Sequence, residues 1–247
     1  MKKFIFQTIA LCIAVQSMAQ ALCVKQSDGT ISEFALSRVD SVSSVVTAYT
    51  GFENGHEWVD LGLYSGTLWA TTNLGGASAN SYGDYFAWGE ITTKDSYTWE
   101  NYTLANGSSD AFTKYCDSSS YGTVDNKTTL EATDDAATQL WGGAWRMPTI
   151  DEWDELLDKC DWTWTTLNGV KGYKVKSTNG NSIFLPAAGC RGGDELDLAG
   201  SYGVYWSSSL DWLDPRQAQH VYFGFGNHRT SSNYRNCGRS VRPVCKK

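Results

Sequence analysis

The side chains best suited to nucleophilic or metal-binding chemistry are the cysteines and histidines, and their spacing favours neither use. No two cysteines form a close Cys-x-x-Cys pair and the histidines are scattered, so we expect no metal site. A thiol nucleophile needs a neighbouring base and a lowered pKa, but Cys237 is flanked by Arg235 and Arg239. Outside the cytoplasm an even number of cysteines permits disulfides, whose pairing stays open. The cysteines after residue 21 are Cys23, Cys116, Cys160, Cys190, Cys237 and Cys245, and the histidines are His56, His220 and His228.

Carboxylates gather in "DEWDELLDKCDW", residues 151–162, the one stretch that offers an acid and base pair. Most of them fall on the polar face of an amphipathic helix, and those near its start favour the helix dipole. We therefore interpret them as a solvated face. The motifs of serine hydrolases, zinc proteases, P-loops and dinucleotide-binding folds are absent from the sequence. We expect no catalytic residue, no cofactor and a protein that is not an enzyme.

The charge is unevenly distributed along the chain. The net charge is −7 and the pI about 4.9, yet no Asp or Glu follows Pro215. The arginines of that segment either form a basic patch for an anionic partner or pair with the acidic body, and for Arg239 and Arg242 we favour pairing. An acidic pI without a recognition motif predicts no nucleic-acid partner.

The first 21 residues have the layout of a secretory signal peptide. Lys2 and Lys3 precede the apolar run "FIFQTIALCIAV", which is too short to span a membrane, and small residues follow at cleavage spacing. We expect an exported protein, in the periplasm, at the cell surface or secreted, with no transmembrane segment after cleavage. Residues 22–50 predict a hairpin that turns at Asp28-Gly29, followed by a Ser/Thr-rich linker. Residues 51–247 form the main domain.

The elements of the main domain predict an α+β fold of short antiparallel strands with two main helices and long loops. One helix is expected in "TDDAATQLWGG" after a Thr133 cap, and another in "TIDEWDELLDKC" behind a capping box of Thr149 and Glu152. Residues 91–130 are poor in aliphatic side chains and predict a loop-rich excursion. Strands are expected in "GYKVKSTNGNSIFLPAAG", which turns at Asn179-Gly180, and in "YGVYWSSSL", "AQHVYFGFGN" and "GRSVRPVC". We assign Trp141, Trp145, Trp153 and Trp206 to the core.

The segment from 211 to 236 combines features of a contact surface. In the strand 218–225, Val221, Phe223 and Phe225 alternate with His220 and Tyr222, so the first set should point inward and the second outward. Residues 227–236 follow as a polar stretch without helix or strand period, which predicts a loop. Trp212 in the polar connection 211–216 is expected to contact a ligand.

Several blocks resemble one known family. These are "GHEWVDLGLYSGTLWATTNLG", "YGDYFAWGE", "WGGAWRMPTIDEWDELL", "GNSIFLPAAG", "YGVYWSSS" and "GRSVRPV", and in this order they are similar to the Fibrobacter succinogenes major paralogous domain family of exported Bacteroidetes proteins. The resemblance implies a C-type-lectin-like fold of the formylglycine-generating-enzyme type. Some members are variable proteins of diversity-generating retroelements, and residues 227–238 contain only side chains that such variation can reach. The calcium and sugar motifs of C-type lectins and the paired cysteines of formylglycine-generating enzymes are missing, so neither activity is carried over.

These features together predict an exported ligand-binding or adhesion module that presents a C-terminal binding loop to an extracellular protein or glycan. Two alternatives stay open: a copper- or thiol-dependent oxidase that uses Cys237 and Cys245, and a structural envelope protein without a ligand. The expected ligand-binding residues are Asp211, Trp212, His220, Tyr222, His228, Arg229, Thr230, Ser231, Ser232, Asn233, Tyr234 and Arg235.

Overall fold

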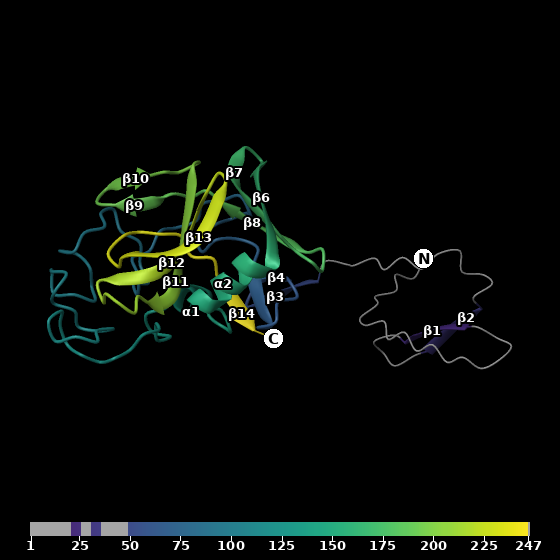
Figure 1. Ribbon diagram of the computed structural model, residues 1–247, viewed down its shortest axis with the longest axis horizontal. Helices are drawn as coiled ribbons and strands as arrows, with labels where there is room; N and C mark the ends of the chain where they lie inside the picture. Colours follow the sequence, from purple (N-terminus) through teal and green to yellow (C-terminus); the bar gives the residue numbers. More distant parts are fainter. Residues whose placement is uncertain (1–20, 26–30, 36–48, 247) are drawn as a thin grey trace. The chain divides into compact units, whose positions relative to one another are not determined.

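The computed structural model describes residues 21–25, 31–35 and 49–246 (Figure 1). The chain divides into two compact units, Met1–Val46 and Thr47–Lys247. In the first unit, β1 (Ala21–Lys25) pairs antiparallel with β2 (Ile31–Ala35), at the place where the sequence predicts a hairpin. Residues 1–20 of the signal peptide expected over 1–21, the Asp28-Gly29 turn and most of the Ser/Thr-rich linker lie outside the described residues. No helix in the described ranges is long and apolar enough to cross a membrane.

The second unit is built mainly from antiparallel strands, which corrects the expected α+β class with two main helices. Its helices are short: α1 (Ala136–Trp141) has 6 residues and α2 (Ile150–Lys159) has 10. The cap signals locate both helices but do not measure their share of the fold. The described strands of this unit form four sheets: β14-β5-β4-β3, β6-β7-β8, β10-β9 and β11-β12-β13. Their bounds are β3 (Thr50–Glu53), β4 (His56–Asp60), β5 (Thr67–Ala70), β6 (Cys160–Leu167), β7 (Val170–Ser177), β8 (Ser182–Pro186), β9 (Cys190–Gly192), β10 (Glu195–Asp197), β11 (Tyr202–Leu210), β12 (Gln217–Gly224), β13 (Asn227–Tyr234) and β14 (Val244–Lys246).

Local signals explain where the helices begin. The Thr149–Glu152 capping box is confirmed, because the Thr149 hydroxyl accepts from Glu152 N and the Glu152 carboxylate accepts from Thr149 N. In α1 the cap is Asp135 and not the expected Thr133, since the Asp135 side chain accepts from Thr138 N. That helix ends at Gly142, whose φ of +65° suits glycine.

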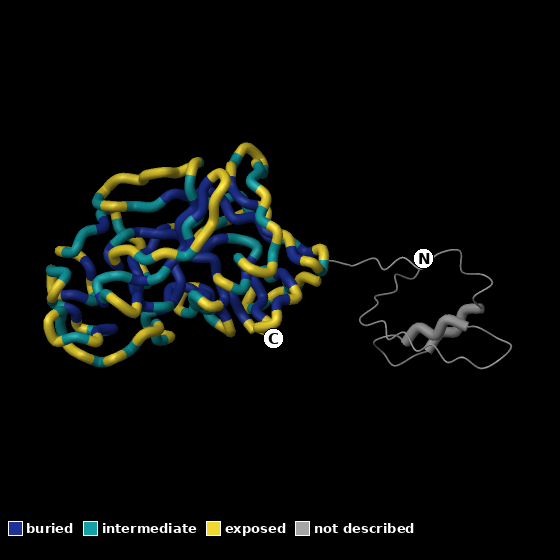
Figure 2. Tube along the Cα trace, in the orientation of Figure 1, coloured by how far each residue is buried: buried dark blue, intermediate teal, exposed yellow. Residues whose placement is uncertain are grey.

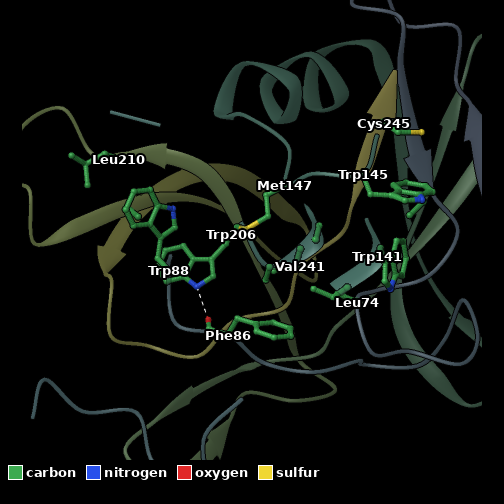
Figure 3. Packing of buried hydrophobic residues seen from close by; sticks show 14 of the residues in the cluster. Leu74, Phe86, Trp88, Trp141, Trp145, Met147, Trp206, Leu210, Val241 and Cys245 are labelled. Atoms are coloured by element: carbon green, nitrogen blue, oxygen red, sulfur yellow. Dashed lines mark hydrogen bonds between the residues drawn. The ribbon is translucent and has the colours of Figure 1, made fainter. Parts of the chain in front are cut away.

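Tryptophans fill the interior as expected. Trp141, Trp145, Trp153 and Trp206 are all buried. The Trp206 indole donates to Phe86 O at 2.9 Å, so its polar atom is satisfied inside the core (Figure 3). The predicted loop-rich stretch 91–130 is confirmed, since it holds turns, bends and isolated bridges. Its buried Tyr102 hydroxyl donates to Trp88 O at 2.5 Å, which joins the excursion to the core.

The last described residues form the edge strand of the β14-β5-β4-β3 sheet. β14 pairs with β5 in the register Val244↔Trp69, and Arg146 forms a bridge with Val244 on the other side. Ahead of β14, Val241 O accepts from Leu74 N at 2.9 Å. The segment 238–240, predicted as part of a strand, makes isolated bridges only, among them Phe86↔Arg239.

Candidate ligand-binding surface

The expected loop 227–236 is a strand over most of its length. β13 pairs with β12 through eight consecutive residue pairs, from Gly224↔Asn227 to Gln217↔Tyr234. Phe225 and Gly226 form the turn, where Gly226 has a φ of +85°. The loop prediction is wrong because β13 carries polar side chains on both faces. It therefore lacks the apolar alternation by which strands are recognised in a sequence.

The alternation predicted for β12 is only partly confirmed. Val221 and Phe223 are fully buried, as expected, but Phe225 lies in the turn and is 82% exposed. His220 was expected outward and is buried at 4% exposure, with its ring edge-on to Trp206 at 5.8 Å. Tyr222 is half-buried and stacks on Tyr202 at 5.1 Å. β12 is the central strand of its sheet and is covered on both faces, so period-2 reasoning for a one-sided sheet misplaces His220.

A groove of about 350 Å³ lies where α2 approaches the β12–β13 pair. Its lining residues are Ile150 and Asp154 from α2, Trp212 from the connection before β12, Gln219 from β12, and Thr230, Ser231 and Ser232 from β13. Trp212 is 74% exposed, in keeping with its expected role as a contact residue. The groove thus gathers one large aromatic ring, three hydroxyls and two polar side chains.

Asp211 fixes the connection that carries Trp212. One oxygen of its carboxylate accepts from the backbone N–H groups of Leu213 at 2.9 Å and Asp214 at 3.0 Å. The other oxygen accepts from the Ser232 hydroxyl at 2.5 Å. Asp211 is itself buried, so it positions Trp212 and Ser232 more than it faces a ligand.

Two hydrogen-bond acceptors border the groove. Asp154 is an exposed residue, yet the partial desolvation of its carboxyl raises its pKa, as do the nearby Asp151 and Asp158, while a hydrogen bond with Thr230 opposes the shift. The Gln219 Oε1 atom is buried and has no hydrogen-bond partner among the described residues. Because this oxygen is covered, a ligand reaches it only when the Gln219 side chain shifts, and the new hydrogen bond would then satisfy an unpaired buried acceptor.

The outer surface of β13 continues from the groove. Arg229, Ser231 and Asn233 are exposed, and the Arg229 guanidinium lies 6.0 Å from the Tyr222 ring centre. At the two ends of the strand, His228 stacks on Trp162 at 4.9 Å and Tyr234 lies edge-on to Trp99 at 5.9 Å. These ring contacts hold both ends of β13 against the body.

Arg235 does not belong to this surface, although the sequence placed it there. Its side chain is fully buried, and its guanidinium lies 4.4 Å from the Phe112 ring centre and 4.9 Å from that of Trp88. It donates to the Tyr102 hydroxyl and to three backbone carbonyls, those of Tyr115, Pro215 and Lys114, at 3.0 to 3.2 Å. Arg235 is a structural residue directly after β13.

The expected pairing of Arg239 and Arg242 with acidic residues is also wrong. Arg242 donates to Asn73 Oδ1, Ala70 O and Phe184 O at 2.9 to 3.0 Å, and Arg239 lies 4.3 Å from the Trp206 ring centre. Neither forms an ion pair with a carboxylate in the described part of the chain. Burial lowers the pKa of each guanidinium to about 10.

The thiols of Cys237 and Cys245 lack the lowered pKa of an activated nucleophile. Burial raises the pKa of Cys237, against the opposing charge of Arg239, and raises that of Cys245 to about 11. An activated thiol has a lowered pKa instead. All five cysteines from Cys116 to Cys245 are free thiols, and residues 21–25, 31–35 and 49–246 contain no cluster that could hold a metal.

Sequence reasoning missed Ile150, Asp154 and Gln219. Asp154 was assigned to a solvated helix face, and no local signal shows that this face borders a strand that begins more than 70 residues later. No protein-family model, curated protein or solved structure matches this chain.

Proposed function

We propose that this protein is an exported module that binds an extracellular protein or glycan through the groove and the exposed side of β13. The observation that carries the proposal is the groove itself. It joins an exposed Trp212 with an unpartnered acceptor on Gln219 and the hydroxyls of β13. An aromatic ring supplies contact area at low entropy cost, and the hydroxyls supply adaptable hydrogen bonds. The resemblance to the Fibrobacter succinogenes family agrees with this role and is part of the proposal.

The support comes from how the surface is built. Trp212 is anchored through Asp211, and β13 is paired with β12 over its whole length. The ligand therefore meets groups that are already in place, and it spends less entropy on ordering the protein. The thiol-oxidase alternative has no comparable support, since burial raises the pKa of both Cys237 and Cys245.

The test is binding of the mature chain to arrays of glycans and extracellular proteins. We expect Trp212→Ala to weaken any specific signal at least tenfold, because exposed aromatics dominate such contacts. The matched control is Tyr64→Ala, which removes another exposed ring, 92% accessible, from outside the groove. A blank array, or equal losses in both variants, would reject the proposal and favour a structural protein without a ligand.

A further inference from the structure

We propose that the partner of this surface is an extended, acidic segment of another protein, which adds to the β11-β12-β13 sheet as a fourth strand along β13. This inference rests on the proposed function, since it names the partner of the same surface. It departs from a loop that binds through side chains alone, because the main chain of β13 would supply a large part of the contact.

The hydrogen-bond register shows which backbone groups of β13 are open. Gly224 and Asn227 are paired across a two-residue turn, and at the far end Arg235 N donates to Arg216 O at 3.0 Å. Odd-numbered residues of β13 therefore bond to β12, and even-numbered residues direct their N–H and C=O groups away from it.

Six of these outward groups are available to a partner. They are the N–H and C=O groups of His228, Thr230 and Ser232, and none of them has a hydrogen-bond partner in the described ranges. At the end of the strand, Tyr234 N donates to Asn233 Oδ1 and Tyr234 O accepts from Cys237 N. Donors and acceptors that alternate at a two-residue spacing match the backbone of another strand.

The edge lacks most of the features that prevent strand addition, and the charged Arg229 is the exception. β13 is eight residues long, contains no proline or lysine, and keeps its register without a bulge. Its residues are exposed or half-exposed throughout (Figure 2). The opposite edge of the same sheet differs, because β11 forms bridges there with Gly189 and Ser240. One edge of this sheet is covered and the other is open.

The charges along β13 indicate which kind of partner segment would bind to it. β13 contains no carboxylate, and the exposed Arg229 is in no ion pair among the described residues. On the groove side, Asp154 and Gln219 Oε1 are acceptors. Since side chains alternate across a strand, the partner should carry Asp or Glu on the Arg229 side and hydrogen-bond donors on the groove side. A second copy of β13 offers no carboxylate to Arg229.

The experiment selects linear 12-residue peptides from a random displayed library against the mature chain. Selected peptides are then tested on Thr230→Pro, which removes an outward N–H but no β12–β13 bond, and on the control Thr230→Val, which keeps that N–H. Both variants lose the Thr230 hydroxyl that lines the groove, so the difference between them reports on the N–H alone. We expect Thr230→Pro to bind about tenfold more weakly than Thr230→Val. Thermal unfolding of both variants reports whether each still folds.

A second measurement does not depend on a variant. Selected peptides are N-methylated at every second residue, on either the odd or the even positions, and each of these two phases removes half of the backbone donors. One of the two phases should abolish binding to the unaltered protein. Binding should also slow amide exchange at His228, Thr230 and Ser232.

Three results would overturn the inference: no enriched peptide, insensitivity to both N-methylation phases, or self-association through β13 detected by light scattering. If arrays reveal a Trp212-dependent ligand that Thr230→Pro binds as well as Thr230→Val does, the proposed function stands and strand addition is wrong. If the arrays are blank and no peptide is enriched, both are wrong.

Discussion

Replacing Arg235 by alanine separates a structural role from a binding role. The arginine is fully buried and donates to four acceptors, of which three are backbone carbonyls. Each acceptor left without a partner costs about 1 to 1.5 kcal/mol, and loss of the ring contacts adds to this. We therefore expect Arg235→Ala to lower the free energy of unfolding by about 4 to 6 kcal/mol.

Urea unfolding followed by tryptophan fluorescence gives that free energy directly, and the melting temperature should fall by roughly 10 to 20 °C. The control is Arg229→Ala, which removes an exposed guanidinium from the same strand and should change stability by less than about 0.5 kcal/mol. If Arg235→Ala unfolds within about 1 kcal/mol of the unaltered protein but no longer binds a ligand, the buried assignment is wrong and Arg235 belongs to the binding surface.

Three further predictions concern pH, one ion pair and the open strand edge. Burial, reinforced by the Arg239 charge, lowers the pKa of His220 well below 6.5 in the folded protein, so unfolding in acid takes up a proton. The stability that comes from neutral His220 should be fully present above pH 6.5 and decline below it. His220→Gln should therefore flatten the profile of melting temperature between pH 6.5 and 5. An unchanged slope in His220→Gln would contradict this. Glu152→Gln breaks the 2.6 Å ion pair with Arg146 and should lower the free energy of unfolding in urea by about 3 kcal/mol. The control Asp151→Asn, on the exposed face of the helix, should lower it by less than about 1 kcal/mol. Equal losses would refute the structural role of the Glu152–Arg146 pair. In the free protein, amide exchange measured by NMR should alternate along β13, fast at Thr230 and Ser232 and slow at Ser231; uniform protection would show that the edge is covered.

Local chemistry made part of this fold predictable. The Thr149–Glu152 capping box, the core tryptophans and the hairpin of β7 and β8 around Asn179-Gly180 were all recognised, because each depends on a few neighbouring residues. The fold class was wrong because cap signals show where helices start and not how much of the chain they occupy.

The candidate surface was predictable in outline only. Trp212 and the polar side chains from 228 to 234 were proposed because a large aromatic in a polar connection and an unpatterned polar run are local signals. His220 and Arg235 were misplaced because their burial depends on packing against Trp206 and on the 102–115 excursion, far away in the sequence. The groove depends likewise on the approach of α2 to β13, which no spacing in the sequence reveals.

The pairing of β14 with β5 has a consequence for how the chain folds. One edge of β5, together with Leu74 and Phe86, pairs with residues 239–246, more than 150 positions later. Such distant pairings make the search for the native topology slow, because long loops must close before the contacts form. Strands β3, β4 and β5 can pair with one another early, but the outer edge of β5 stays unpaired until β14 has been synthesised. We expect refolding on the slow side for a domain of this size.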